Sequence, residues 1–180
     1  EDTARALQAS AGAGARIRRN GSRGLYWLEP LIEVECAAGR IAYGPVTASD
    51  VPALLRAGLL EGGAHPLRIG PIGQHPWLTS QQRLTFARVG DIDPLDLDAY
   101  EASGGYRGLR RALEIGPAAA VKEVLDSGLR GRGGAGFPTG VKWATVAKSA
   151  GDKKYVICNG DEGDPGAFMD RSVMEGDPHR

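Results

Sequence analysis

Glycine density between two predicted helices constrains this chain more than any other feature. In the stretch LRGRGGAGFPTGVKW, residues 129–143, five glycines fall within ten residues, at positions 131, 133, 134, 136 and 140. Glycine loses more conformational freedom on folding than any other residue, so such density is unfavourable unless the fold or a ligand requires bare backbone. The stretch therefore predicts a loop shaped for close approach to its backbone.

The loop matches known phosphate-binding patterns only superficially. Gly131, Gly133 and Gly136 give the spacing GxGxxG, but the preceding element is a predicted helix over 117–127, whereas the dinucleotide fingerprint follows a strand. A P-loop is also disfavoured, because five residues instead of four separate Gly134 from Gly140, and Val141 separates Gly140 from Lys142. The preceding helix thus disfavours the dinucleotide motif, and the spacing disfavours the P-loop.

The chemistry of the loop still favours a ligand. Free backbone N–H groups, the cation of Arg132 and a helix N-terminus with Lys142 in its first turn together form an anion-binding cradle. Phe137 supplies a ring that can stack on a planar group. The alternative is a tight turn between two helices, which needs only one or two glycines. Five glycines exceed that need, so we interpret the loop as a binding element.

A second loop, CNGDEGDPGAFMDR over residues 158–171, carries carboxylates. We expect it to follow a buried strand, Tyr155–Cys158, and therefore to lie where ligands bind in α/β proteins. Its candidate ligand-binding side chains are Asn159, Asp161, Glu162 and Asp164. A calcium loop does not fit, because Gly163 occupies a position that requires an oxygen ligand. The alternative is a solvated acidic turn.

Composition limits the class of protein. Lys plus Arg and Asp plus Glu both number 22, so we expect no nucleic-acid partner. The sequence contains no run of 18 apolar residues, so no transmembrane helix is expected. Cys36 and Cys158 are isolated, which is typical of reduced thiols in a cytoplasmic protein, and Cys158 is expected to be buried. The chain begins at Glu1 and not at Met, so it reads as part of a longer polypeptide.

Periodicity and turn residues predict the remaining elements. A hairpin is expected over 31–43 with its turn at 38–39, followed by a helix with a Thr or Ser cap and Pro52 near its start. Residues 62–98 read as an extended connection with one short strand at 83–89 and with Trp77, Leu84 and Phe86 buried. Further helices are predicted at 3–9, within the stretch GGYRGLRRALEIG (104–116) with its end at Gly116, at 117–127 and at about 141–149.

In combination, the two loops resemble the flavin- and NADH-binding subunit of respiratory complex I and its soluble relatives. These relatives are the diaphorase subunits of NAD-reducing hydrogenases and the β subunits of NAD-dependent formate dehydrogenases. The stretches NGSRGLYWLEPLIEVECAAGRIAYGPVTASDVPALL and RLTFARVGDIDPLDLDAY look most like the formate dehydrogenase β subunit. The resemblance covers nearly all 180 residues but only the first part of that subunit.

This resemblance implies an α/β fold in two parts. Residues 1–68 are expected to form a thioredoxin-like domain, 69–99 an extended connection, and 100–180 the start of an FMN- and NADH-binding domain of the complex I type. The family's two-iron module uses a cysteine pair, and the matching positions here are Ser22 and Tyr26. Since neither side chain can replace a thiolate ligand, the first domain is expected to carry no cluster.

The resemblance also implies roles for the loop residues. Gly131, Arg132, Gly133 and Gly134 would border FMN and NAD, Phe137 would stack on the dinucleotide, and Lys142 would offset negative charge. Asn159, Asp161 and Glu162 would bond the flavin edge and ribityl chain, and Asp164 would bond the dinucleotide. No catalytic base and no metal ligand is expected in these residues, and a [4Fe-4S] cluster is expected only in the part beyond Arg180.

The function implied is hydride exchange between NAD(H) and FMN, with electrons passing through iron–sulfur centres so that formate oxidation reduces NAD⁺. The expected partners are a molybdenum or tungsten catalytic subunit and a small ferredoxin-like γ subunit, in the cytoplasm and without membrane insertion. These 180 residues alone are expected to be inactive. Two alternatives stay open: a diaphorase subunit of a hydrogenase or complex I-like enzyme, and a non-catalytic thioredoxin-like docking module.

Overall fold

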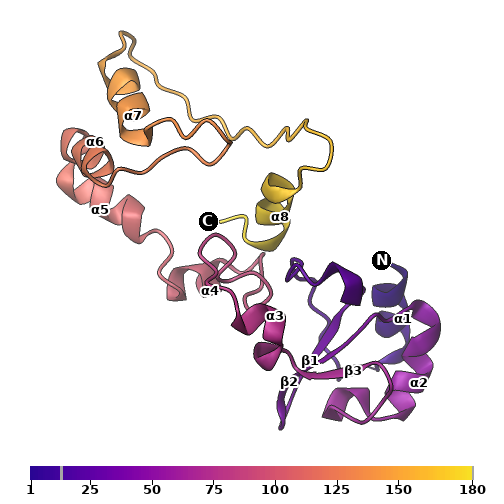
Figure 1. Cartoon of the computed structure of the whole chain (residues 1–180). Helices are drawn as coiled ribbons and strands as arrows, with labels where there is room; N and C mark the ends of the chain where they lie inside the picture. Colours follow the sequence, from indigo (N-terminus) through magenta and orange to yellow (C-terminus); the bar gives the residue numbers. More distant parts are fainter. Residues whose placement is uncertain (13, 180) are drawn as a thin grey trace. The chain divides into compact units, whose positions relative to one another are not determined.

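The computed structural model of the chain describes residues 1–12 and 14–179 (Figure 1). The chain divides into two compact units. The first comprises Glu1–Asp96 together with Phe168–Arg180, and the second comprises Leu97–Ala167. The mixture of a small sheet with many short helices agrees with the α/β class expected from the sequence.

A three-stranded antiparallel sheet with the order β1-β2-β3 forms the centre of the first unit. Its strands are β1 (Ile32–Cys36), β2 (Gly39–Tyr43) and β3 (Arg68–Pro71). The predicted hairpin is confirmed, with Ile32 paired to Tyr43 and Cys36 to Gly39. Its two-residue turn lies at 37–38, one residue earlier than predicted, and Gly39 opens β2 with a φ of +93°. Glycine adopts this backbone conformation without the steric cost that a side chain would bring.

The third strand was not predicted, and the strand predicted at 83–89 is wrong. Strand β3 pairs with β2, with Ala42 opposite Gly70 and an irregularity between Ala42 and Tyr43. Residues 83–89 form turns instead. The sequence RIGP of β3 is short and carries both glycine and proline, which propensity assigns to a loop. Strand β3 begins at residue 68, so the sheet extends into the segment expected to be a connection.

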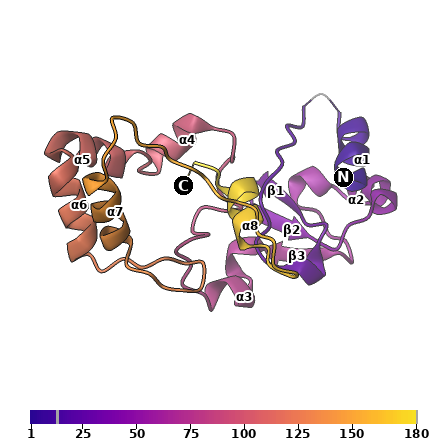
Figure 2. The same ribbon diagram turned by 90° about the horizontal axis from the view of Figure 1, so that it is seen from above.

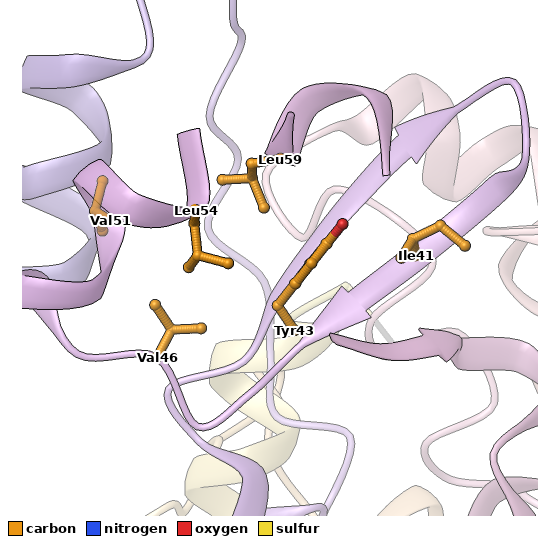
Figure 3. Packing of buried hydrophobic residues seen from close by; sticks show 6 residues of the cluster. All are labelled: Ile41, Tyr43, Val46, Val51, Leu54 and Leu59. Carbon is orange, nitrogen blue, oxygen red and sulfur yellow. The ribbon is translucent and has the colours of Figure 1, made fainter. Parts of the chain in front are cut away.

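The main hydrophobic core lies on one face of the sheet. Helix α2 (Val51–Arg56) and the 3-10 turn η3 (Leu59–Glu61) cover this face. Figure 3 shows the six buried side chains gathered between these elements and β2: Ile41, Tyr43, Val46, Val51, Leu54 and Leu59. The Tyr43 hydroxyl donates to the Gly63 carbonyl at 2.7 Å, and burial raises the pKa of this tyrosine. Strand β2 is thus held by packing and by a satisfied polar group.

A capping box explains why the covering helix starts where it does. Thr47 N–H donates to Asp50 Oδ2 at 2.8 Å, and Asp50 ends the short turn η2 (Ala48–Asp50) that leads into α2. Pro52 lies in the first turn of α2, as predicted, where no backbone donor is needed. Helix α1 (Asp2–Ser10), also predicted, packs against η2 and α2.

The opposite face of the sheet is covered as well. Side chains alternate between faces along a strand, so Ala42 points away from its neighbours Ile41 and Tyr43. It packs in a second cluster with Leu25 and Ile72, which come from the segments next to η1 (Tyr26–Leu28) and in η4 (Ile72–Gln74). The central strand β2 is therefore buried on both faces.

A buried arginine links the sheet to the loop that follows β3. Arg23 donates to Glu33 through Nε at 2.5 Å and Nη2 at 2.9 Å, and to Gly90 O and Asp91 Oδ1 at 2.9 Å each. Burial lowers the pKa of Arg23, but Glu33 and Asp91 raise it by more, so the guanidinium stays charged. This network explains why Glu33 is partly buried on an otherwise amphipathic strand.

Two side chains in this unit contradict the predicted burial. Leu84 is exposed, and Trp77 of helix α3 (Pro76–Thr79) is about half exposed. Trp77 meets Trp27 edge to face, with ring centroids 5.3 Å apart, instead of entering the core. Phe86 is partly buried. The contact with Trp27 therefore covers part of the Trp77 ring, which was expected to be buried in the core.

The second unit is built from helices. These are α4 (Leu97–Ala102), α5 (Arg107–Ile115), α6 (Pro117–Asp126) and α7 (Thr139–Lys148). Figure 2 shows α5, α6 and α7 side by side, and α6 contacts both of its neighbours. The predicted boundaries at Gly116 and Pro117 are confirmed, and α7 begins two residues before the predicted start. No apolar side chain described in this unit is fully buried, so its helices lack a closed core.

The predicted buried strand Tyr155–Cys158 is wrong. Tyr155, Val156 and Ile157 are exposed, Cys158 is exposed, and none of these residues lies in a strand. Figure 1 shows the connection from α7 to α8 (Met169–Gly176) as a long coil. A strand requires a neighbour, and the bridge Arg130–Pro138 is the one strand-like pair that the structure describes in this unit. The apolar run has the propensity for a strand but no pairing partner here.

Among residues 1–12 and 14–179, no helix has both the length and the apolar character needed to cross a membrane.

Candidate binding site

The glycine loop is a closed structure between α6 and α7. A strand-like bridge joins Arg130 to Pro138, Gly131 N–H donates to Phe137 O at 2.9 Å, and Thr139 N–H donates to Leu129 O at 2.9 Å. Residues 131–137 therefore form a loop whose two ends are fastened together. This geometry restricts the loop and holds its glycines outside the helices.

One residue that closes the loop was not singled out from the sequence. The Arg130 Nη1 donates to Gly136 O at 2.9 Å, across the loop, while its backbone forms the bridge to Pro138. The available signal in the sequence was its position directly before the glycine run. A flexible loop does not require such a cross-strand donor, so Arg130 indicates that the shape of the loop is specified.

The five positions of the loop carry glycine for different physical reasons. Gly140 lies in α7 against α6, where a β-carbon would come within 2.5 Å of Leu125 Cα. Gly134 and Gly136 have φ angles of +108° and +60°, which other residues rarely adopt. Helix packing and backbone conformation thus account for three of the five.

Gly131 and Gly133 are different. Neither has a positive φ, a β-carbon on Gly133 would meet nothing within 4 Å, and one on Gly131 would make only ordinary contacts with Phe137. The chain could carry side chains at both positions without strain or steric conflict. Within the described residues, nothing in the protein itself requires bare backbone there. A ligand that approaches the loop from outside would require it.

Charged and aromatic side chains of the glycine loop and of the first turn of α7 are exposed. Arg132 and Lys142 are exposed, and Phe137 is 53% exposed. Lys142 lies in the first turn of α7, whose N-cap Pro138 provides no side-chain cap. The first N–H groups of a helix have no intrahelical acceptor and carry the positive end of its dipole. The loop therefore combines a bare backbone, two cations and an exposed ring.

The acidic loop is shaped by local contacts. Asp161 N–H donates to the Asn159 Oδ1 at 3.1 Å, and a turn joins Ala167 N–H to Asp164 O at 3.1 Å. Glu162 has a φ of +48°, an unusual backbone conformation for a residue other than glycine. Asn159, Asp161 and Asp164 are exposed and Glu162 is partly buried. The loop follows a coil and not the predicted strand, so the expected position at the end of a buried strand is wrong.

All ten candidate residues lie in the second unit. The glycine loop contributes Gly131, Arg132, Gly133, Gly134, Phe137 and Lys142, and the acidic loop contributes Asn159, Asp161, Glu162 and Asp164. The contacts described above each lie within one loop, so the approach of the two loops to a common ligand stays a prediction.

Among the residues that the structure describes, no group of three or more His, Cys, Asp or Glu side chains could hold a metal ion. Carboxylates are hydrogen-bond acceptors, and the acidic loop exposes those of Asp161 and Asp164. Ligands rich in hydroxyl, amide or ring N–H groups match such acceptors.

Comparison with known proteins adds to this geometry. Residues 124–180, which include both loops, match the family described as the Nuo51 FMN-binding domain. The chain is 54% identical over 99 residues to the NADP-reducing hydrogenase subunit HndC of Solidesulfovibrio fructosivorans, which is 55% of this chain and 20% of that protein. It is 61% identical over 85 residues to an NADH-quinone oxidoreductase subunit of Rhizobium meliloti strain 1021. These residues are 47% of this chain and 20% of that protein.

A third similar protein is an NADH-quinone oxidoreductase subunit of Escherichia coli strain K12. It is 45% identical over 98 residues, which cover 53% of this chain and 22% of the relative. The chain spans about a fifth of the length of these curated relatives.

Proposed function

From its relationship to the flavin subunits of complex I and of NAD(P)-reducing hydrogenases, we propose that this chain contributes to an FMN and NAD(H) site that exchanges hydride. The observation that carries the proposal is the bare backbone at Gly133. A side chain there would cost the protein nothing, yet the position is glycine. Two planar rings that stack beside the loop would need the space that a side chain would occupy.

The residues present fit these cofactors. Arg132 and Lys142 supply positive charge for phosphate, and the helix N-terminus beside them supplies N–H donors. Phe137 is exposed and can stack on an aromatic ring. Asn159, Asp161 and Glu162 can accept hydrogen bonds from a flavin edge and its ribityl chain, and Asp164 from a dinucleotide hydroxyl or carboxamide.

The part played by the chain is binding and alignment. When bound, FMN supplies two-electron exchange with a dinucleotide and one-electron exchange with iron–sulfur centres. The glycines would keep side chains out of the space that the rings need, and Phe137 would stack on the dinucleotide. Arg132 and Lys142 would offset the charge of the phosphates. Hydride exchange needs alignment rather than a proton acceptor, so none of these residues serves as a general base.

Replacing Lys142 by glutamine tests the phosphate contact. We expect the Kd of FMN to rise about tenfold or more, because one charge-assisted contact is lost. Lys148→Gln is the matched control, since Lys148 is exposed in the last turn of the same helix. Flavin fluorescence during rebinding of FMN to the flavin-depleted native protein measures both constants. Equal affinities for the two variants would contradict the contact.

We further propose that the enzyme is a cytoplasmic NAD-dependent formate dehydrogenase, with a molybdenum or tungsten subunit and a small ferredoxin-like subunit as partners. The resemblance to formate dehydrogenase β subunits that we read from residues 20–55 and 83–100 of the sequence supports this choice over a hydrogenase. Metal analysis of the large subunit that purifies with this chain decides between the two. Molybdenum or tungsten agrees with the proposal, and nickel would assign the chain to a hydrogenase.

The first 68 residues form a thioredoxin-like module without a cluster in this proposal. The Ser22 hydroxyl donates to Glu29 and accepts from Gly24 N–H at 3.0 Å, while Tyr26 is exposed. Both positions therefore carry groups that cannot bind iron as thiolates do. A two-iron electron paramagnetic resonance signal that maps to residues 1–68 would overturn this part.

A further inference from the structure

We infer that Arg88 and Asp177 form a positioning pair that fixes the end of the acidic loop without contacting the ligand. The inference rests on the proposed function. Its basis is the path of the chain: the acidic loop continues directly into Phe168 and helix α8, and α8 belongs to the first unit. Whatever holds α8 therefore also holds one end of the loop.

The pair is bidentate and buried. Arg88 Nε donates to Asp177 Oδ2 at 2.8 Å and Arg88 Nη2 donates to Asp177 Oδ1 at 2.9 Å. The exposed fractions of the two side chains are 16% for Arg88 and 1% for Asp177. Such a fork has one well-defined geometry, and a carboxylate this deeply buried is strongly unfavourable without its partner. The pair thus specifies one position for the C-terminal end of α8.

Backbone packing at the same place acts independently of charge. Gly176 ends α8 beside Gly21, so closely that a β-carbon on Gly21 would clash with the Gly176 Cα. A β-carbon on Gly176 would lie 2.8 Å from a methyl group of Val89, which is itself 1% exposed. Asp177 N–H donates to Val173 O at 2.8 Å and closes the helix. Two glycines and an ion pair therefore seat α8 on segments near residues 21 and 89.

Anchoring one end of a binding loop affects affinity through entropy. A loop that is free at one end samples more conformations and loses more of them when a ligand orders it. If α8 were released, the carboxylates of the acidic loop would have to be ordered at the moment of binding. The pair therefore lowers the cost of binding, although neither residue touches the ligand.

Asp177→Asn keeps the side-chain shape and removes the charge. We expect amide hydrogen exchange in residues 159–176 to accelerate about tenfold or more and the Kd of FMN to rise by a similar factor. Glu175→Gln is the matched control, because Glu175 pairs with Arg171 on the same helix at 2.9 Å with both side chains exposed. The control should change neither quantity by more than about twofold.

Two more variants separate anchoring from a general loss of stability. Gly21→Ala adds one methyl group and no charge, and should accelerate the same amides. The double variant Arg88→Gln/Asp177→Asn leaves no buried unpaired charge, so it should recover part of the affinity lost in Asp177→Asn. All variants are made in the native protein that carries this chain, with far-ultraviolet circular dichroism as the check on folding.

Each outcome decides a separate point. Unchanged exchange in Asp177→Asn and Gly21→Ala overturns the anchoring of α8. Faster exchange with an unchanged FMN Kd overturns the positioning role and leaves the proposed function intact. If the wild-type protein binds no FMN, the proposed function fails, and the exchange rates of residues 159–167 still decide whether the pair anchors the loop.

Discussion

Gly133→Val is expected to lose NADH-dependent flavin reduction while the protein folds as before. A β-carbon at Gly133 meets nothing within 4 Å and the φ angle lies outside the left-handed region, so the chain accepts valine at this position. The branched side chain instead enters the space proposed for the stacked rings. Because displacing a reacting ring by about 1 Å can lower a rate about 100-fold, the expected loss is at least that large.

Anaerobic stopped-flow reduction by NADH and thermal unfolding measure the two halves of this prediction. The matched control is Gly73→Val, since a β-carbon on Gly73 also meets nothing within 4 Å and its φ is also outside the left-handed region. The control should retain both rate and stability. Unchanged NADH binding and unchanged flavin reduction in Gly133→Val would show that the loop does not border the stacked rings. That result would favour the docking module, whose assembly with partners tolerates the substitution.

Gly140→Val is expected to do the opposite and disrupt the second unit. A β-carbon at Gly140 would lie 2.5 Å from Leu125 Cα and 2.6 Å from Leu125 N, which are backbone atoms that cannot rotate away. Helices α6 and α7 must separate to make room. Overpacking of this kind typically costs about 1–3 kcal/mol, and no described apolar side chain of this unit is buried to offset it.

Amide hydrogen exchange over α6 and α7 tests this effect. The matched control is Gly108→Val, because Gly108 is also helical and a β-carbon there meets nothing within 4 Å. The control should keep wild-type exchange in α6 and α7. Protection in Gly140→Val equal to that of the wild type would show that the two helices do not need the close approach.

Local signals explain which elements were predictable. The boundary between α5 and α6 is marked by Gly116, whose φ is +79°, followed directly by Pro117 at the first helical position. Both residues act within one turn of the helix, so the sequence contains all the information that the boundary needs. The hairpin β1–β2 was predictable for the same reason, since its strands are joined by a two-residue turn.

Non-local pairing explains the failures. Strand β3 exists because β2 lies beside it, and its own sequence RIGP has weak strand propensity. Residues 155–158 have the reverse problem: YVIC has strong strand propensity and lies exposed without a pairing neighbour. Propensity describes a fit to a sheet and not the presence of that sheet, so it misjudged both segments.

The sequence singles out the residues proposed for the candidate site, but it does not give the physical reason for each glycine. Sequence spacing singled out the glycine loop, yet it could not separate Gly140, which packs helices, from Gly133, which has open space. That distinction depends on Leu125 of another helix. The cross-loop donor Arg130 was missed because its role depends on the bridge to Pro138.

The most direct test of the central claim is the flavin content of the native protein, followed by anaerobic addition of NADH while the flavin absorbance is recorded. One FMN per chain that bleaches on addition of NADH is the predicted result, and it would account for the bare backbone at Gly133. Absence of flavin, or bound flavin whose absorbance does not respond to NADH, would contradict the account.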